Sequence, residues 1–291
     1  MTTRRPRLID TFPSTPRTQP MEVLVLSPAR TGTTSIEAAL GILGFKVYRG
    51  MKHAYLEAAR GKGPNTYPLW SEALDAAYQP SNNTSNTLAP YSPTDLEKIL
   101  SPYTAASGWP LSLFPQLALE AYPTAKVILM SRPPTSFSAS MTRALSPRLT
   151  WWSWNWILPL EGGLIRDCIR CGQRCLNAFS GGKPWDRAVL EEKYAAHNES
   201  VTSLCKAQPG RELLVFEATQ AWGPLCEFLG VDVPKDTPWP REAVGGAFEK
   251  QGRMFWMMAL AKVIVKVGAV AAVVGAGVWA WRNGYIPVHL G

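Results

Sequence analysis

The chain has 291 residues, which is enough for one large α/β domain with additions at its ends. Its net charge of +8 is concentrated in residues 1–20, which carry +3, and residues 241–291, which carry +4. The body between them is nearly neutral, which disfavours nucleic acid as a partner, and five cysteines without a secretory signal favour reduced thiols in a cytosol.

The N-terminal segment, residues 1–20, is rich in proline, threonine and arginine and has no hydrophobic periodicity. It lacks the apolar core of a signal peptide. We therefore expect a disordered basic leader, and an organelle presequence is the less favoured alternative.

A short apolar run over residues 21–26 leads into a glycine turn and then a helical pattern over residues 36–43. This order is typical of a phosphate cradle, because the N–H groups of the turn and the positive end of the helix dipole converge on one anion. Arg30 adds a planar cation, whereas the lysine that a magnesium-nucleotide loop needs after its glycine is missing after Gly32. Hydroxyl donors at the expected helix start are Thr33, Thr34 and Ser35. The loop predicts a site for a phosphate-like group, not for a magnesium nucleotide.

Along the body, strands and helices are expected to alternate. Strands are predicted at residues 45–48, 125–130 and 213–216, helices at residues 54–59, 69–78, 95–100, 113–121 and 222–229, and a polar loop over residues 80–94. Such alternation predicts an α/β fold with a parallel sheet flanked by helices.

A second anion site is predicted where the strand at residues 125–130 ends. Arg132 follows this strand, and Ser140 lies on the helical run after it. Parallel sheets bind ligands at the carboxyl ends of their strands, so Arg132 is expected to face the same crevice as the glycine turn. Arginine offers two parallel hydrogen bonds to a phosphate and the serine a further donor. An ordinary strand-end arginine is the alternative interpretation.

The cysteines at 168, 171 and 175 are spaced to share one helical face. They do not match a four-ligand zinc or iron–sulfur pattern, so we interpret them as a core-facing stripe and predict no metal site.

The segment at residues 151–158 is unusually rich in tryptophan. Three interpretations remain open: a packed core, a lid over an apolar acceptor, or a surface that dips into a membrane.

Residues 263–281 form a 19-residue apolar stretch with Lys266 as its one charge. As a helix it would be about 28 Å long, close to the roughly 30 Å hydrocarbon core of a bilayer. Lys262 and Lys266 are expected to snorkel to the near interface. Tryptophans and a tyrosine flank the stretch at positions 256, 279, 281 and 285, as aromatic belts do. A buried helix of the soluble domain is the alternative, but the stretch has no polar face.

The charges around this span predict its orientation. Cations gather on its N-terminal side, in a basic juxtamembrane segment over residues 249–262. By the positive-inside rule the body stays cytosolic, and residues 282–291 form a short tail on the other side. This is the pattern of a single-pass tail anchor in an endomembrane.

The ordered run of motifs resembles the sulfotransferase superfamily, and more narrowly the fungal-type P-loop sulfotransferase family that is often mislabelled as an epimerase family. The segments that carry the resemblance lie at residues 28–35, 120–129, 194–198, 213–216 and 222–230. The resemblance covers residues 21–248 and implies a P-loop NTPase-like sheet. It also implies 3′-phosphoadenosine 5′-phosphosulfate as co-substrate and no metal. The residues implied to hold the 5′-phosphosulfate are Arg30, Thr31, Gly32, Thr33, Thr34 and Ser35, and those implied for the 3′-phosphate are Arg132 and Ser140.

The implied reaction transfers a sulfuryl group to a hydroxyl of a small, lipophilic acceptor, as in secondary metabolism, with Arg30 stabilising the moving charge. Three side chains are candidates for the base: His53, His197 and Glu217. The acceptor side departs from the family, since Pro133 stands where an aspartate is usual. A membrane-tethered protein that has lost catalysis is therefore the second hypothesis, and a P-loop kinase, disfavoured by the missing lysine, is the third.

Overall fold

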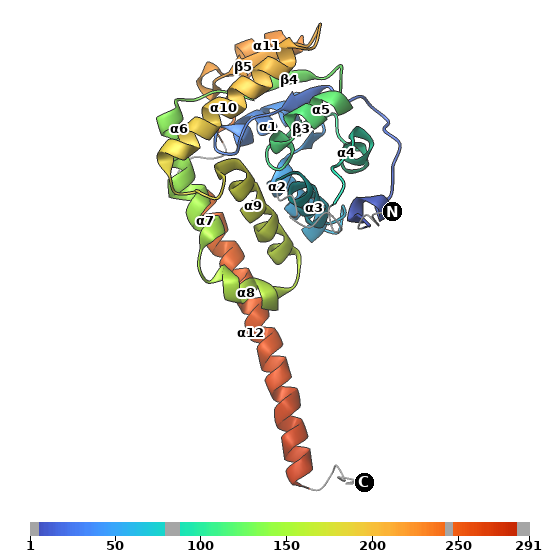
Figure 1. Ribbon diagram of the computed structural model, residues 1–291, viewed down its shortest axis with the longest axis vertical. Helices are drawn as coiled ribbons and strands as arrows, with labels where there is room; N and C mark the ends of the chain where they lie inside the picture. Colours follow the sequence, from blue (N-terminus) through green and yellow to red (C-terminus); the bar gives the residue numbers. More distant parts are fainter. Residues whose placement is uncertain (1–5, 79–87, 242–246, 284–291) are drawn as a thin grey trace.

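A five-stranded, all-parallel sheet forms the centre of the protein in the computed structural model, which describes residues 6–78, 88–241 and 247–283 (Figure 1). The strands are β1 (Val23–Val25), β2 (Val47–Tyr48), β3 (Ala105–Ser107), β4 (Lys126–Met130) and β5 (Leu213–Phe216). They are ordered β2-β3-β1-β4-β5, so β1 lies in the middle with β3 and β4 on either side. The parallel α/β sheet agrees with the predicted fold class.

Helices surround the sheet and extend beyond it. They are α1 (Thr33–Ile42), α2 (Gly50–Ala59), α3 (Tyr67–Tyr78), α4 (Pro93–Leu100), α5 (Pro115–Ala121), α6 (Pro134–Ser140), α7 (Ser146–Thr150), α8 (Trp154–Glu161), α9 (Leu164–Ser180), α10 (Arg187–Lys206), α11 (Trp222–Leu229) and α12 (Ala247–Arg282). Short 3-10 turns are η1 (Leu8–Thr11), η3 (Leu111–Leu113) and η5 (Ala218–Gln220), and η4 (Met141–Leu145) is a π-helical segment.

The two faces of the sheet are covered by different helices because successive side chains of a strand point to opposite faces. Val23 and Val25 of β1 pack with α1 and α11, whereas Leu24 packs into the larger core built on α3, α4, α5, α9 and α10. Strands buried on both faces read as apolar runs without alternation, which is why the sequence pattern of β1 and β4 was clear.

The strand β3 was not predicted. Its sequence, Ala-Ala-Ser, lacks the β-branched and aromatic residues that mark strands, yet all three residues are buried and β3 pairs with both β1 and β2. Small side chains fit here because helices cover the sheet closely on both faces.

The expectation of a disordered leader is wrong for residues 6–20. Ile9 is fully buried, and η1 begins the described chain against α3 and α4. Arg7 pairs with Asp95 at 2.9 Å, and Arg17 pairs with Glu97 at 2.8 Å. These arginines bind acidic groups of the body instead of forming a free basic arm. Residues 1–5 lie outside the described part.

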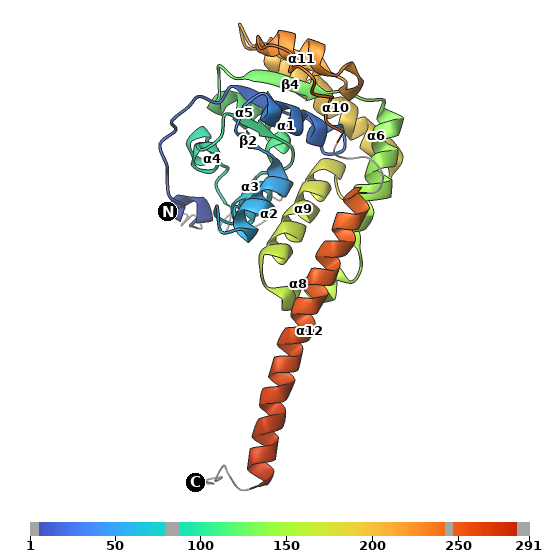
Figure 2. The same cartoon turned by 180° about the vertical axis from the view of Figure 1, so that it is seen from behind.

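The C-terminal helix α12 runs without a break from Ala247 to Arg282, so residues 249–262 are not a separate juxtamembrane segment. Its first half packs on the body through Phe255, Ala259 and Val263, which are buried, and the remainder projects away from the body (Figures 1 and 2). The stretch Gly252–Arg282 is long and apolar enough to span a membrane. The predicted tail beyond residue 283 and most of the predicted 80–94 loop fall outside the described residues.

Candidate active site

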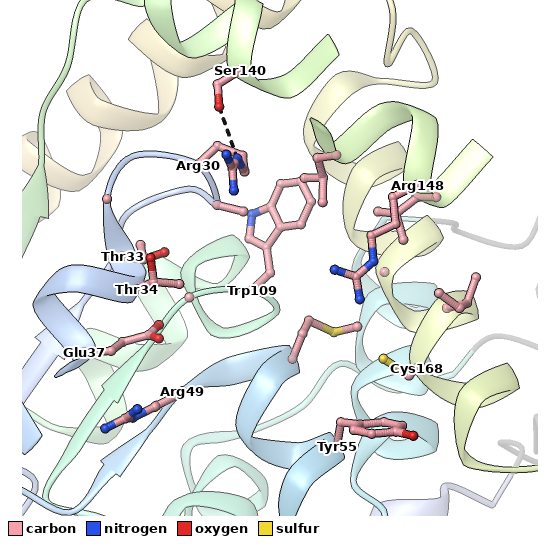
Figure 3. A pocket seen from close by; sticks show the side chains of 18 of the residues that line it. Arg30, Thr33, Thr34, Glu37, Arg49, Tyr55, Trp109, Ser140, Arg148 and Cys168 are labelled. Atoms are coloured by element: carbon pink, nitrogen blue, oxygen red, sulfur yellow. Dashed lines mark hydrogen bonds between the residues drawn. The ribbon is translucent and has the colours of Figure 1, made fainter. Parts of the chain in front are cut away.

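A cavity of about 570 Å³ opens at the carboxyl ends of the strands. Four strands each place one of its lining residues just after their last residue: Arg30 follows β1, Arg49 follows β2, Trp109 follows β3 and Arg132 follows β4. Ligands bind parallel sheets at this edge because the loops there converge on one crevice. The cavity has a cationic end beside the β1–α1 loop and an apolar end between α7, α9 and α12 (Figure 3).

The β1–α1 loop has the backbone that a phosphate cradle needs. Gly32 has φ +104°, and a Cβ there would lie 3.2 Å from Met130 Cε, so glycine keeps the turn close to β4. Arg30 also has a positive φ, +73°, and its side chain lines the cavity with Thr33 and Thr34. The first N–H groups of α1 therefore lie at the same cavity wall as the Arg30, Thr33 and Thr34 side chains.

Two predicted cofactor ligands in this loop do not line the cavity. The Thr31 hydroxyl donates to Pro28 O at 2.8 Å inside the loop, which uses its donor locally. Ser35 is buried in the first turn of α1 and is absent from the cavity wall. Thr31 stabilises the loop and Ser35 packs within the first turn of α1, so direct contact with the ligand is not expected from either.

The predicted second site is brought onto the first. Arg132 donates from Nη1 to the carbonyl oxygen of Arg30 at 2.6 Å and from Nη2 to the Ser136 hydroxyl. Arg30 Nε donates to Ser140 Oγ at 3.1 Å (Figure 3). Partial burial lowers the pKa of Arg132, which marks a guanidinium that an anion would stabilise. Two loops 102 residues apart thus form one cationic end.

The chain after Ser140 adds a feature that the sequence did not indicate. The π-helical segment η4 follows α6 directly and places Arg143 and Leu145 on the cavity wall. Widened turns of this kind are frequent at functional sites because they re-aim side chains within a helical run.

Trp109 forms the wall between the two ends of the cavity (Figure 3). Its ring is 4% exposed, and its Nε1 has no hydrogen-bond partner among the described residues. The loop that carries it sits so close to Gly50 that a Cβ there would lie 2.3 Å from the Trp109 carbonyl oxygen. Gly50 also has φ +52°, so only glycine allows this approach. The buried indole N–H is thus an unsatisfied donor next to the cavity.

Glu37 is a lining residue that sequence reasoning missed. It lies one turn beyond Thr33 on α1, is 4% exposed, and is the one carboxylate among the described residues that line the cavity. Figure 3 shows it below Thr34, on the same side of the cavity as Arg49. The signal was available in principle, because residues four apart on a helix share a face and Thr33 had been assigned to the site.

The apolar end is built from side chains of α2, α7, α9 and α12. They include Met51, Tyr55, Leu149, Ile169, Gly172 and Phe255. Arg148 enters this end and lies over the Phe255 ring at 5.2 Å, and burial lowers its pKa. Gly172 lets Leu149 pack closely against α9 here, since a Cβ at this position would approach Leu149 Cδ2 to 2.8 Å.

The predicted bases do not meet at this cavity. His197 Nε2 lies 2.8 Å from Leu26 O, its ring packs on Phe179, and it is absent from the cavity wall. A role as base for an acceptor in the cavity does not fit this position. Glu217 follows β5 and is also absent from the wall. His53 belongs to α2, but its side chain lies outside the described part.

The cysteine stripe on α9 faces the core, as predicted. Cys168, Cys171 and Cys175 are each buried, and burial raises the pKa of the Cys168 thiol to about 11. Among the described residues, no cluster of three or more histidine, cysteine, aspartate or glutamate side chains could hold a metal ion.

Residues 22–248 match the sulfotransferase domain family, which is more than three quarters of the chain. The chain belongs to this family. The chain is also similar to "Ava biosynthesis cluster protein M" of Aspergillus versicolor, with 28% identity over 267 residues that cover 90% of this chain and 97% of the relative. The family match, residues 22–248, includes both loops of the cationic end and stops at the start of α12. Family membership supports sulfuryl transfer as the general chemistry of the cavity.

Proposed function

We propose that this sulfotransferase moves the sulfuryl group of 3′-phosphoadenosine 5′-phosphosulfate to a hydroxyl of a small, lipophilic acceptor. The observation that carries the proposal is one cavity with a cationic, hydroxyl-rich end joined to an apolar end. The first end suits a ligand with two phosphate groups, and the second suits an acceptor that is transferred out of water.

The donors at the cationic end fit this co-substrate. Arg30 and Thr33, with the first N–H groups of α1, would hold the 5′-phosphosulfate, with Thr34 beside them. Arg132 and Ser140 would hold the 3′-phosphate, and the orphaned Nε1 of Trp109 would donate to an oxygen of the ligand. When bound, the co-substrate supplies the activated sulfuryl group.

Residues of the chain would provide the other requirements of the reaction. Sulfuryl transfer needs charge stabilisation on the moving group, an acceptor in line with it, and a base for the acceptor proton. Arg30 provides a fixed positive charge at the loop, and the apolar end orients the acceptor and excludes water. Glu37 is the group we assign as the base, because it lies on the same helix as the phosphate donors and lines the cavity.

The lining of the apolar end and the similarity to the Aspergillus versicolor protein both support a lipophilic acceptor. Tyr55, Leu149, Ile169 and Phe255 present apolar surface to the acceptor. The similar protein is described as part of a biosynthesis cluster, which supports a secondary metabolite as acceptor here.

We further propose that α12 anchors the protein in an endomembrane through residues 263–281. The helix projects from the body with its valines from Val265 onward exposed, as a lipid-facing span requires. The excess of cations before the span favours a cytosolic body.

Calorimetry with 3′-phosphoadenosine 5′-phosphate, then with magnesium-ATP, tests the ligand, and a radiolabelled sulfate-transfer assay with phenols, sterols and alcohols tests the reaction. We expect binding of the first ligand, no binding of the second, and transfer to a lipophilic alcohol or phenol. Binding without transfer to any acceptor would favour the catalytically degenerate alternative, which Pro133 motivates. Preference for magnesium-ATP would favour a kinase.

A further inference from the structure

The body carries exposed aromatic and apolar side chains where α12 leaves it. Trp156 is 72% exposed and Leu160 is 53% exposed, and their spacing of four places both on one face of α8. Trp152, just before α8, is 70% exposed. These side chains contrast with Trp154 and Leu158 on the same segment, which are buried. Aromatic exposure of this size at one place marks a contact surface.

This surface is fixed to α12. Lys262 Nζ lies 3.1 Å from Glu161 Oε1, and Lys266 Nζ donates to the carbonyl oxygen of Glu161 at 2.6 Å. Before Lys262 on the same helix, Trp256 donates from Nε1 to Ser153 Oγ at 2.9 Å. Its ring stacks on Trp151 with 5.3 Å between centroids. Both views of the ribbon show α8 beside α12 at this level (Figures 1 and 2).

The attachment gives protein partners to the two lysines that were expected to snorkel to the near interface. Lys262 pairs with Glu161, whose side chain is fully buried, and Lys266 binds carbonyl groups at the C-terminal end of α8. A cation at the edge of hydrocarbon is tolerated when it has such partners. The pairing therefore permits this part of the chain to lie at the boundary of a bilayer.

Helix length sets where that boundary falls. The chain from position 267 to Arg282 is free of α8 and rises only about 24 Å, which is short of a hydrocarbon core of roughly 30 Å. With Trp279 and Trp281 at the far interface, the near boundary falls about 20 residues earlier, at the level of Lys262. That is the level at which Glu161 and the end of α8 are attached.

We propose that α8, with its exposed residues Trp152, Trp156 and Leu160, is a second lipid-contacting surface that rests in the bilayer interface beside the span. This inference rests on the membrane anchoring proposed above. Trp256 and Trp151 then lie in the near aromatic belt, and the apolar end of the cavity, whose wall includes Leu149 and Phe255, stands directly above the lipid surface. The acceptor is accordingly of the class that partitions into bilayers.

The test uses the full chain in phosphatidylcholine liposomes. Trp156→Cys is labelled with an environment-sensitive nitrobenzoxadiazole fluorophore and compared in lipids with and without bromine on their acyl chains. Trp185→Cys is the matched control: Trp185 is 53% exposed but follows the C-terminal end of α9, whereas α8 precedes its N-terminal end, about 25 Å away. The five native cysteines are buried, and the labelled wild-type protein measures their background.

We expect the label at position 156 to shift to shorter wavelength and lose most of its emission in brominated lipid, while the label at position 185 does neither. Flotation of the same samples reports the anchor separately. Protein that floats with liposomes but shows equal, weak quenching at both positions would overturn the lipid contact of α8 and leave the anchor intact. Protein that does not float would overturn the anchor and this inference together.

Discussion

Arg30 connects the two halves of the cationic end, because its side chain reaches Ser140 while its carbonyl oxygen accepts from Arg132. A single residue thus couples the strand-turn-helix loop to the helix that follows β4. Its positive φ keeps the guanidinium over the cavity, so both backbone and side chain are specialised.

Replacing Arg30 should separate catalysis from folding. Arg30→Ala is expected to weaken binding of 3′-phosphoadenosine 5′-phosphate by about 10- to 100-fold, from the loss of a hydrogen bond to a charged group, and to lower transfer by at least about 100-fold. Calorimetry and the transfer assay measure the two effects. Arg170→Ala, an exposed arginine on α9, is the control and should change neither. Full activity of Arg30→Ala would contradict the assigned site.

Glu37 should affect the reaction without affecting the bound nucleotide. Glu37→Gln keeps the size of the side chain but removes its ability to accept a proton, so transfer is expected to fall by about 10²- to 10⁴-fold. The affinity for 3′-phosphoadenosine 5′-phosphate should stay within a factor of two or so, because like-sized neutral groups preserve packing. If Glu37→Gln transferred sulfate at the wild-type rate, Glu37 would not be the base, and His53 would be the next residue to test.

At the scale of elements, α7 and α9 define how much room the acceptor has. Gly172 faces Leu149 across the apolar end, and a helix-interior glycine is otherwise unfavourable by roughly 0.5–1 kcal/mol relative to alanine. The glycine therefore trades helix stability for the close packing of Leu149 on α9.

A larger side chain at position 172 would push Leu149 into the apolar end of the cavity and should act on the acceptor alone. Gly172→Leu is expected to raise the KM for bulky acceptors by about tenfold or more, the loss that follows from blocking roughly 1.4 kcal/mol of apolar contact. Nucleotide affinity, measured by calorimetry, should not change. Gly223→Leu, at a glycine of α11 with open space around its Cβ position, is the control. Unchanged kinetics in Gly172→Leu would place the acceptor elsewhere.

The contact between His197 of α10 and Leu26, just after the carboxyl end of β1, should make stability depend on pH. Burial lowers the pKa of His197 below its ordinary 6.5, and the contact with Leu26 O only partly opposes this. Because the unfolded chain binds the proton more readily, the free energy of unfolding should be largest above pH 6.5 and fall as pH drops through and below that value. His197→Gln should lessen this fall in thermal unfolding followed by circular dichroism at pH 7.5 and pH 5.5. If His197→Gln showed the same loss of stability at pH 5.5 as the wild type, His197 would not be the group responsible for it.

At the scale of the whole molecule, the fold places the cavity between the sheet and a helix that is long and apolar enough to span a membrane. The sheet edge supplies the cationic end, and α12 supplies Phe255 to the apolar end before it continues as the proposed span. The proposed anchor and one wall of the cavity therefore belong to the same helix, so the body is not joined to the proposed span by a flexible linker.

Charges within the span should release the protein from membranes. Val270→Asp combined with Val274→Asp places two carboxylates near the bilayer centre, at a cost of about 2.5–3.5 kcal/mol each. We expect the wild type to resist alkaline carbonate extraction and the variant to be extracted. Val215→Asp with Val233→Asp, at exposed valines of the body, is the matched control. Equal extraction of wild type and variant would contradict the anchor.

The sequence by itself determined the elements whose signal is local. The apolar runs of β1, β4 and β5, the glycine turn before α1, the cysteine face of α9 and the apolar length of α12 all follow from backbone preferences and periodicity within a few residues. The pairing of Arg132 with the β1 loop was also predictable, because parallel strands end at one edge.

Only the tertiary structure decided what depends on contacts between distant segments. The alanines of β3 become a strand because β1 and β2 pair with them on both sides, and the arginines of residues 6–20 are ordered by acidic partners on α4. Glu37 enters the cavity, His197 turns away from it, and two lysines bind α8. The physical reason is that burial and pairing are properties of assembled surfaces, which no local pattern in the chain encodes.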